Sequence, residues 1–390
     1  MKTIKERSSR KAVLVVCMVD SIHSARWLQH FKNQEIDFYL FPSTPNRKIH
    51  SEIEALSKNS GEVSATYRTL YSTKYLSILL WAIDLIFSNR IRGFLIARST
   101  KKYSIDLIHA MELNHAGYLV AQAAKSSNVA NLRIISSVWG SDIFWFGRFD
   151  KHKKELKKIL RITDSLISEC NRDSFLAAEL GFTGKFIQAP SLFGFDSEDL
   201  QREFTVPSSR NVILIKGYES FVGRASIALA ALSELKEVIQ NFEVIVYSAN
   251  FKTVRLVHKI NKEFSLGIKV YRKKAFNSKQ MLQLFTSARC HVGISLSDGV
   301  PATLLESMVS GTFPIQTNTS CADQWVVDGQ SALLVKPEVK EVRTALLRAL
   351  EDDNLVDQAM AINSKVAKER LSNEFVSGKL ARTYDSSVSS

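Results

Sequence analysis

The sequence predicts an α/β protein made of two doubly wound domains, each with a largely parallel sheet. Three observations carry this prediction. Short apolar runs typical of buried strands alternate with helical patterns along the whole chain. At 390 residues the chain is long for a single core, so two domains are expected. A stretch with two prolines and no regular period, 189–209, interrupts the alternation near the middle of the chain.

The strand-like runs set the expected order of elements. In the first half they are separated by helical patterns such as HAGYLVAQAAKSS, and they lie at 11–17, 36–41, 105–110, 133–138, 165–169 and 186–189. In the second half they lie at 211–216, 243–248, 268–271, 291–295, 313–316 and 332–335. We therefore expect a first domain over 1–200, a second over 208–370 and a terminal helix over 371–390.

Charge is distributed unevenly along the chain. The net charge is +13, and residues 1–190 hold 28 basic against 17 acidic side chains. A basic first half suggests a polyanion or an anionic membrane surface as partner, although solubility alone can also explain it. The most apolar segment, 75–87, is too short to span a bilayer and is expected to form a buried or interfacial helix.

The cysteines and the start of the chain indicate the compartment. Four cysteines lie far apart without a CxxC pair, which argues against a disulfide framework or a zinc site. The start MKTIKERSSRK lacks the pattern of a secretory signal. We expect a cytoplasmic protein, with possible peripheral attachment at the inner face of the plasma membrane.

The most informative stretch runs from Ser295 to Pro337. Asp298 is a candidate helix cap, Pro301 is expected near the first turn of that helix, and Gly311 is suited to end it. Strand-like runs lie on both sides. Free backbone N–H groups at a helix start beyond a strand end form an anion-binding arrangement in an α/β sheet.

This stretch resembles the signature of family 4 glycosyltransferases, which have the GT-B fold of two Rossmann-like domains facing across a cleft. In that signature two glutamates are separated by seven residues, and Asp298 and Glu306 hold those places. The surrounding matches are Gly299, Pro301, Leu304, Leu305, Met308, Gly311 and Pro314. One departure is that the first acid is Asp298 instead of glutamate. The resemblance also implies that the terminal helix returns to the first domain.

The resemblance implies a role for each acid. On one helix the two carboxylates would lie about 12 Å apart, too far to act on one anomeric carbon but suited to the ends of a nucleotide-sugar. The implied ligands are the ribose for Glu306 and the donor sugar for Asp298, and Asp298 is assigned to the catalytic residues. Backbone groups at Gly299, Val300, Pro301 and Ala302 would meet the phosphates or the sugar, proline itself offering no N–H. A capping Asp298 and a solvated Glu306 are the alternatives.

The segment Ile213–Ser226 joins a strand to a helix through a glycine-containing loop. Arg and Lys in a dry cleft stabilise a departing diphosphate. Gly223-Arg224 matches the family's GR pair, and Lys216 precedes it where the family lysine commonly follows. We expect Lys216 and Arg224 to be catalytic phosphate ligands, against the alternative of an ordinary surface loop.

Several first-half residues follow strand ends and are candidate ligands. Trp139, at the place of a family histidine, and Asp142 are assigned to the donor, although packing at a strand end is an alternative. His23 and Arg26, three apart on one helix face, and His109 and Glu112 are assigned to the acceptor or phosphate side. His109, Glu112 and His115 have the types of metal ligands but loose spacing, so cleft polar groups are the favoured interpretation.

The sequence thus predicts a metal-independent, retaining GT-B glycosyltransferase without a cofactor. Its donor would be a UDP- or GDP-hexose, and its acceptor a lipid-linked or cell-surface oligosaccharide, as in lipopolysaccharide or other polysaccharide biosynthesis. No P-loop, GxGxxG or GxSxG motif supports a kinase, dehydrogenase or hydrolase. A nucleotide-sugar epimerase and a non-catalytic basic binding protein remain alternatives. No motif of a nucleic-acid module is present. The helix at 151–161, with its lysine-rich face, is expected to contact either anionic lipid or solvent.

Overall fold

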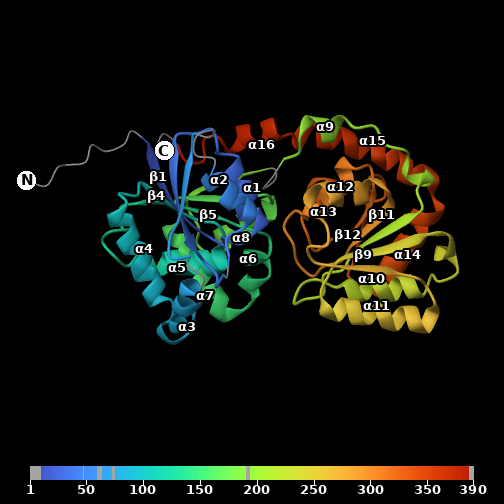
Figure 1. Cartoon of the computed structure of the whole chain (residues 1–390), viewed down its shortest axis with the longest axis horizontal. Helices are drawn as coiled ribbons and strands as arrows, with labels where there is room; N and C mark the ends of the chain where they lie inside the picture. The colour runs from blue at the N-terminus through green and yellow to red at the C-terminus, as the bar shows by residue number, and fades with distance from the viewer. Residues whose placement is uncertain (1–9, 47, 59–63, 73–74, 190–193, 386–390) are drawn as a thin grey trace, which may run out of the picture. The chain divides into compact units, whose positions relative to one another are not determined.

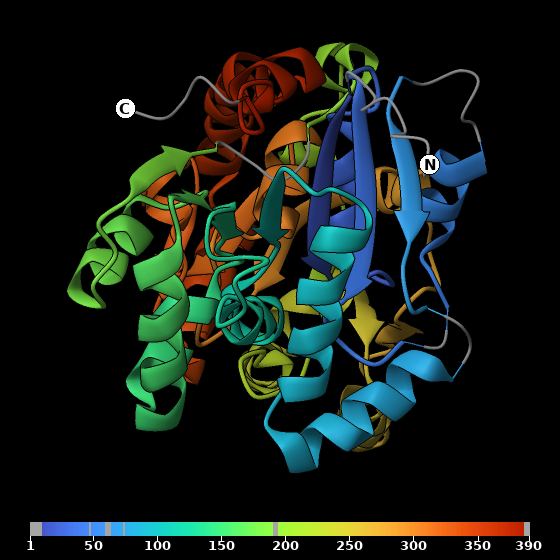
Figure 2. The same cartoon turned by 90° about the vertical axis from the view of Figure 1, so that its left-hand side faces the viewer.

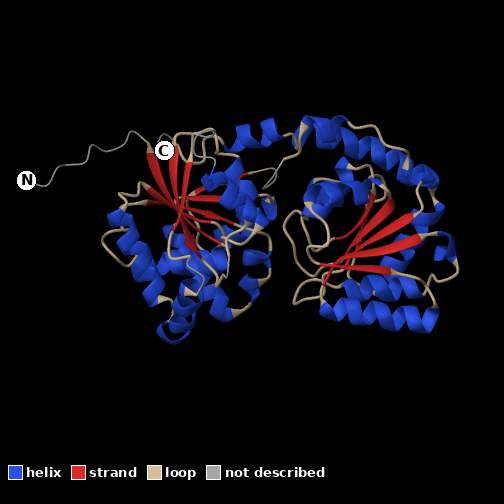
Figure 3. Cartoon of the chain, viewed as in Figure 1, coloured by secondary structure: helices blue, strands red, loops and turns tan. Residues whose placement is uncertain are grey.

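Two parallel sheets organise the chain, as the alternating pattern predicts (Figures 1 and 3). The computed structural model describes residues 10–46, 48–58, 64–72, 75–189 and 194–385. The chain divides into two compact units, one formed by 1–194 with 376–390 and the other by Phe195–Phe375. Residues 195–200, expected in the first domain, belong to the second unit because the backbone of Phe195 bonds to Leu371 and Asn373.

The sheet of the first unit has the strand order β3-β2-β1-β4-β5-β6-β7, with every pair parallel. Its strands are β1 (Lys11–Cys17), β2 (Ile36–Pro42), β3 (Thr66–Thr69), β4 (Leu107–Ala110), β5 (Arg133–Ser137), β6 (Ser165–Ser168) and β7 (Lys185–Gln188). Strand β3 was not predicted: it is an edge strand whose sequence TYRT buries only Tyr67.

Helices cover both faces of this sheet (Figures 2 and 3). They are α1 (Ile22–Gln29), α2 (Ser51–Lys58), α3 (Leu76–Phe87), α4 (Arg90–Lys102), α5 (Tyr118–Ala123), α6 (Ser141–Phe144), α7 (Asp150–Ile162) and α8 (Asn171–Glu179). A π-helical turn, Leu113–Gly117, leads into α5, and a 3₁₀ turn, Phe146–Arg148, leads into α7. Strand β1 is buried along nearly its whole length, as expected for a strand with helices on both faces.

The second sheet has the order β10-β9-β8-β11-β12-β13 and is also parallel. Its strands are β8 (Val212–Lys216), β9 (Glu243–Ala249), β10 (Lys269–Arg272), β11 (Ala288–Gly293), β12 (Phe313–Thr317) and β13 (Leu333–Val335). The order places β8 beside both β9 and β11, so the strand order reverses there. In open α/β sheets ligands bind at the carboxyl ends of strands beside such a reversal.

The helices of the second unit are α9 (Ser197–Gln201), α10 (Ala225–Ser233), α11 (Phe251–Phe264), α12 (Ser278–Thr286), α13 (Ala302–Val309), α14 (Val339–Glu351) and α15 (Asp353–Arg370). Short 3₁₀ turns lie at Pro207–Ser209, Val238–Asn241 and Ala322–Gln324. The larger apolar cluster packs β8, β9 and β11–β13 against α10, α11, α14 and α15, and a smaller one around Phe285 lies beneath α12.

The last helix, α16 (Asn373–Leu380), leads the chain back into the first unit. His30 Nδ1 lies 2.9 Å from Ser377 Oγ. Tyr384 is buried in the first core, where its hydroxyl accepts a hydrogen bond from Trp27 Nε1 at 2.9 Å. The first unit therefore contains residues from both ends of the described chain.

No helix in the described part of the chain is both long enough and apolar enough to cross a membrane. The apolar segment at 75–87 forms α3, a helix as predicted, but its apolar side chains are exposed or half-buried and none is buried. All four cysteines are buried free thiols.

Candidate active site

Three loops meet at the carboxyl ends of β8, β11 and β12 in the second unit. The loop after β8 pairs with the loop after β11: Arg224 N donates to Ile294 O at 3.0 Å and Leu296 N donates to Val222 O at 2.8 Å. Ser295 N in turn donates to Thr317 Oγ1 at the end of β12, at 3.2 Å. The predicted residues of this half, Lys216, Arg224, Asp298 and the start of α13, are thereby held in one region.

Helix α13 begins at Ala302, with Pro301 at its N-cap and no side-chain cap. Asp298 was predicted to cap this helix, and that prediction is wrong. Asp298 lies outside the helix, and its Oδ1 accepts from the adjacent Gly299 N at 2.9 Å. The N–H groups of Ala302 and Thr303 lack partners within the helix, as in the first turn of any helix, so its positive end remains available for an anion. The 12 Å separation derived from one continuous helix does not apply to Asp298 and Glu306.

Glu306 lies in the middle of α13 and is half-buried. It acts electrostatically on Tyr247 of β9. Burial raises the pKa of Tyr247 well above its ordinary value, and the negative charge of Glu306 adds to the shift. The Tyr247 hydroxyl lies 3.0 Å from Nε2 of His291 on β11. Sequence reasoning did not single out Tyr247 or His291, because both lie inside apolar strand-like runs.

Lys216 is the last residue of β8 and is half-buried. Its charge reaches His291: burial, the larger cause, and the positive charge of Lys216 together lower the pKa of His291 to about 3. His291 is therefore neutral at physiological pH, and Lys216 supplies positive charge at the end of β8. Glu306 acts on Tyr247 and Lys216 acts on His291, so an anion and a cation both lie near the Tyr247–His291 pair.

Arg224 directs its guanidinium back into its own loop. Nη1 donates to Ser220 O at 2.6 Å and to Gly223 O at 2.8 Å. Gly223 has no room for a side chain, since a Cβ there would lie 2.2 Å from Tyr218 O. The arginine thus stabilises a tight loop, and its Nη1 hydrogens are directed to these two carbonyls.

Glu219 is another residue that sequence reasoning missed. Its Oε2 accepts from Ser226 N at 2.8 Å, in the first turn of α10. The starts of α10 and α13 therefore differ in whether a carboxylate is bound there. The start of α10 already has a carboxylate, and the start of α13 does not. An anion at this edge of the sheet is accordingly better accommodated by α13.

In the first unit, Asp142 is part of the loop framework and not a ligand group. It is buried, and its Oδ2 accepts from Leu113 N at 2.9 Å and from Trp139 N at 3.2 Å. Burial raises the pKa of Asp142 to about 7. The donor assignment for Asp142 is not supported by this orientation, because the carboxylate connects the loops after β4 and β5.

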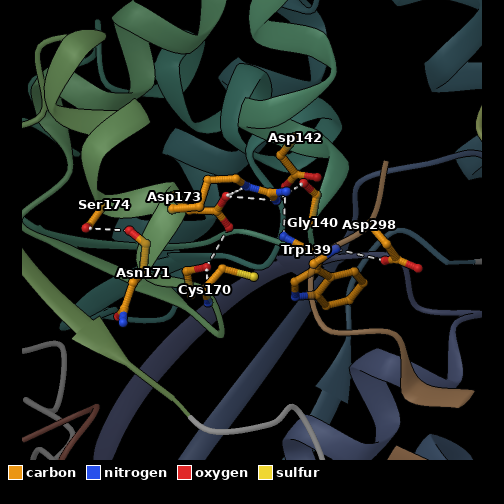
Figure 4. A network of polar contacts seen from close by, with 11 residues as sticks. Trp139, Gly140, Asp142, Cys170, Asn171, Asp173, Ser174 and Asp298 are labelled. Atoms are coloured by element: carbon orange, nitrogen blue, oxygen red, sulfur yellow. Dashed lines mark hydrogen bonds and ion pairs between the residues drawn. The ribbon is translucent and has the colours of Figure 1, made fainter. Parts of the chain in front are cut away.

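A polar network continues from Asp142 to the loop after β6 (Figure 4). Arg172 Nη2 donates to Gly140 O at 3.4 Å and to Asp173 Oδ1 at 3.1 Å. Asp173 Oδ2 accepts from Ser168 Oγ at 2.7 Å. Arg172 also lies over the Phe144 ring, 4.1 Å from its centroid. The loops at three strand ends are thus fixed by internal contacts.

His109 is a core residue, contrary to its assignment as a ligand. It is fully buried, with Nδ1 2.7 Å from Tyr384 Oη and Nε2 2.7 Å from Ser137 Oγ. Burial lowers its pKa to about 3. Glu112 is also buried; it accepts from Ser43 Oγ at 2.7 Å, and burial raises its pKa to about 7. These partners occupy both side chains. Neither is directed to a ligand, contrary to the prediction.

The other first-unit candidates are at least partly exposed. His23 and Arg26 are half-buried on α1, and the His23 ring lies edge-on to Trp139 with centroids 5.7 Å apart. His115 is exposed. Among the residues that the structure describes, no group of three or more His, Cys, Asp or Glu is arranged to hold a metal ion.

Comparison with known families and structures agrees with this architecture. Residues 196–366 match the family described as glycosyl transferases group 1, and residues 12–170 match glycosyl transferase 4-like. No curated protein sequence gives a significant match.

Solved structures share the fold over nearly the whole chain at low identity. Anabaena HepE with UDP-glucose is 14% identical, covers 97% of this chain and 100% of its own, and has a TM-score of 0.70. Sucrose-phosphate synthase from Thermosynechococcus elongatus is 13% identical with 96% and 98% coverage and a TM-score of 0.72. The lipopolysaccharide outer core galactosyltransferase WaaB is 15% identical, with 95% and 98% coverage and a TM-score of 0.67.

Proposed function

We propose that this chain, whose two halves match glycosyltransferase families and whose fold is GT-B, is a glycosyltransferase that transfers a hexose from a UDP- or GDP-sugar. The acceptor is a hydroxyl of a lipid-linked or cell-surface oligosaccharide, reached at the inner face of the plasma membrane. The family matches favour transfer over the epimerase or the basic binding protein that the sequence left open.

One observation carries the donor part of this proposal. Lys216, the uncapped start of α13 and Glu306 lie around the Tyr247–His291 pair, at the reversal of strand order beside β8. A nucleoside diphosphate has anionic phosphates beside ribose hydroxyls. The lysine and the helix start suit the phosphates, and Glu306 suits the hydroxyls, because a carboxylate accepts their hydrogen bonds.

We assign the roles accordingly. Glu306 binds the ribose, and the Asp298–Ala302 loop contacts the sugar and the phosphates. Lys216, together with Arg224 once it leaves its loop carbonyls, neutralises the departing diphosphate. Charge that develops on the leaving group is stabilised most strongly in a dry site.

The proposed stereochemistry is retention, by displacement on the face that the diphosphate leaves. The acceptor oxygen attacks the anomeric carbon as the bond to the diphosphate oxygen breaks. The departing diphosphate takes the proton of the acceptor hydroxyl. The proposed chemistry uses no cofactor and no metal ion.

A thermal-shift screen tests this proposal. Wild type and Glu306→Ala are heated with UDP, GDP, ADP and their common sugars. A nucleotide that stabilises the wild type but not the variant identifies the donor, since ligands that bind only the folded state raise its stability. The absence of any shift in the wild type, with any nucleotide, would contradict the donor site.

A further inference from the structure

Helix α3 buries polar side chains, while its apolar side chains are exposed or half-buried. Its sequence is LSILLWAIDLIF, yet the residues it buries are Ser77 and Asp84. Ser77 Oγ donates to Asn46 O at 2.8 Å and accepts from Asn46 N at 3.1 Å. Asp84 forms a 2.8 Å ion pair with Arg92 Nε. These buried polar contacts fix the rotation of the helix, so its apolar face is directed outwards.

The outward face is continuous. Tyr75, Leu79, Ala82 and Ile86 follow the i, i+4, i+7, i+11 spacing of a single helical stripe, and all four are exposed. Ile86 is 79% exposed. The other large exposed apolar side chains of α3 and α4 are Leu79, Leu85, Phe87 and Phe94. Single exposed apolar side chains are ordinary on protein surfaces, whereas a contiguous patch of this kind indicates a binding surface.

The charges around this patch indicate the chemistry of its partner. Between residues 75 and 102 the only acidic residue is Asp84, which is buried and paired. The exposed charged residues of α4 are all basic: Arg90, Arg98, Lys101 and Lys102. An apolar face with a basic rim matches a bilayer of anionic lipids. Two copies of this face would bring like charges together, which disfavours a symmetric dimer.

Helix α7 extends the basic surface at the same end of the first unit (Figures 1 and 2). Its outward side chains form a shallow groove lined by Lys151, Lys154, Glu155, Lys157, Lys158 and Arg161. Phe149, at the N-cap of α7, is also exposed. The helix buries Leu156, Ile159 and Leu160, so its lysines remain outside the core.

We propose that the outward face of α3 inserts into the headgroup region of an anionic bilayer, with the basic side chains of α4 and α7 against the lipid phosphates. Twelve residues are too few to span a bilayer, which needs about 20, so the helix would lie in the plane of the surface. This inference deepens the proposed function and rests on it for the lipid-linked acceptor, which would lie in the same surface.

Vesicle sedimentation of the whole chain tests the insertion. Wild type is expected to bind phosphatidylcholine vesicles that contain phosphatidylglycerol, and to bind pure phosphatidylcholine more weakly. Leu85→Ser/Ile86→Ser should lower the partition coefficient by about tenfold or more, because it removes two apolar side chains from the interface. Phe251→Ser, at an exposed position of α11, is the matched control and should bind like wild type.

A second pair of variants tests the charge. Arg98→Glu/Lys101→Glu should weaken binding to the anionic vesicles only, whereas Lys259→Glu/Lys262→Glu on α11 should have little effect. Melting curves establish that each variant is folded. The proposal is overturned if wild type does not bind anionic vesicles. It is also overturned if the Leu85→Ser/Ile86→Ser variant binds them as well as wild type does.

An environment-sensitive fluorophore distinguishes insertion from contact with another protein. Attached through Ile86→Cys, it should shift to the blue with anionic vesicles, and attached through Phe251→Cys it should not. A wild-type dimer that the α3 variant dissociates, without loss of vesicle binding, would make this face a protein interface and refute the proposal. Because none of these measurements needs a donor sugar, vesicle binding without transfer would refute only the proposed function.

Discussion

His291 Nε2 and the Tyr247 hydroxyl lie 3.0 Å apart and join β11 to β9 across β8. Both residues are buried; the charge of Lys216 acts on His291 and the charge of Glu306 acts on Tyr247. The donor region is therefore supported from below by a hydrogen bond in the sheet layer, as well as by the loops above it.

Tyr247→Phe should lower the free energy of unfolding by about 1–3 kcal/mol, because it leaves the buried Nε2 of His291 without its partner. Urea unfolding measures the change. Tyr271→Phe, at an exposed tyrosine of β10, is the control and should leave stability unchanged. Equal stability of the Tyr247 variant and wild type would show that the hydrogen bond has no net effect.

Glu306→Gln should raise the donor KM by about tenfold or more, because a carboxylate holds ribose hydroxyls more strongly than an amide does. Steady-state kinetics with varied donor measure this change. Glu341→Gln, on the exposed side of α14, should behave as wild type. Wild-type kinetics in the Glu306 variant would remove the ribose assignment.

Lys216→Ala and Arg224→Ala should lower kcat by about 10²–10³-fold, and more than they weaken donor binding, because charge grows on the diphosphate in the transition state. The two variants should differ in stability. Arg224→Ala also frees the carbonyls of Ser220 and Gly223, so it should melt at a lower temperature than Lys216→Ala. An unchanged kcat in either variant would exclude that residue from catalysis.

Asp142 should make stability depend on pH. Burial raises its pKa from 3.8 to about 7, so the folded state binds this proton more tightly than the unfolded chain does. Its contribution is therefore complete below about pH 4 and is lost as the pH rises through 7. Asp142→Asn lacks this titration, so the stability of wild type relative to the variant should fall by about 2–4 kcal/mol across that window.

Urea unfolding of wild type and Asp142→Asn at about pH 4, 5.5, 7 and 8 measures this difference in the free energy of unfolding. These pH values span the expected window, about 4–7. Asp150→Asn, at an exposed carboxylate of α7, is the matched control and should show no such trend. A stability difference that stays constant with pH would mean that burial does not hold the Asp142 proton.

Tyr384→Phe should destabilise the first unit by about 1–3 kcal/mol, because Trp27 Nε1 and His109 Nδ1 both lose their partner in the core. Differential scanning calorimetry measures the change. Tyr218→Phe, at an exposed tyrosine in the loop after β8, should melt like wild type. A normal melt for the Tyr384 variant would show that the ring alone anchors the terminal segment.

The sequence was most informative where pattern and packing agree. Every predicted strand is present within a few residues, and the predicted GT-B fold is confirmed, since parallel strands covered on both faces are apolar throughout. The edge strand β3 was missed because one face of it is exposed. Gly311 adopts a positive φ of 66° directly after α13, as its predicted role at the helix end requires.

The candidate site was less predictable, because sequence position does not show where a side chain points. Asp142 and His109 follow or lie in strands as expected, yet both are directed inwards, to backbone groups and to Tyr384. The contact of His109 with Tyr384 joins residues 275 positions apart, and no local pattern indicates it. Lys216 and Glu306 were chosen through the resemblance to the family signature; they lie at the end of β8 and within α13, in the strand and helix expected there, and their ligand roles stay predictions.

The return of the chain to the first unit has a consequence for its synthesis. A ribosome that has completed β7 has made all the strands of the first sheet, but not Tyr384, which fills the core beside Trp27 and Phe31. The second unit, Phe195–Phe375, is complete in sequence before that tyrosine is made. Domains generally fold as units in order of synthesis. In this protein the domain that is translated first receives its last core residue only at the end of synthesis. Its core would be incomplete at a time when the second domain can already fold.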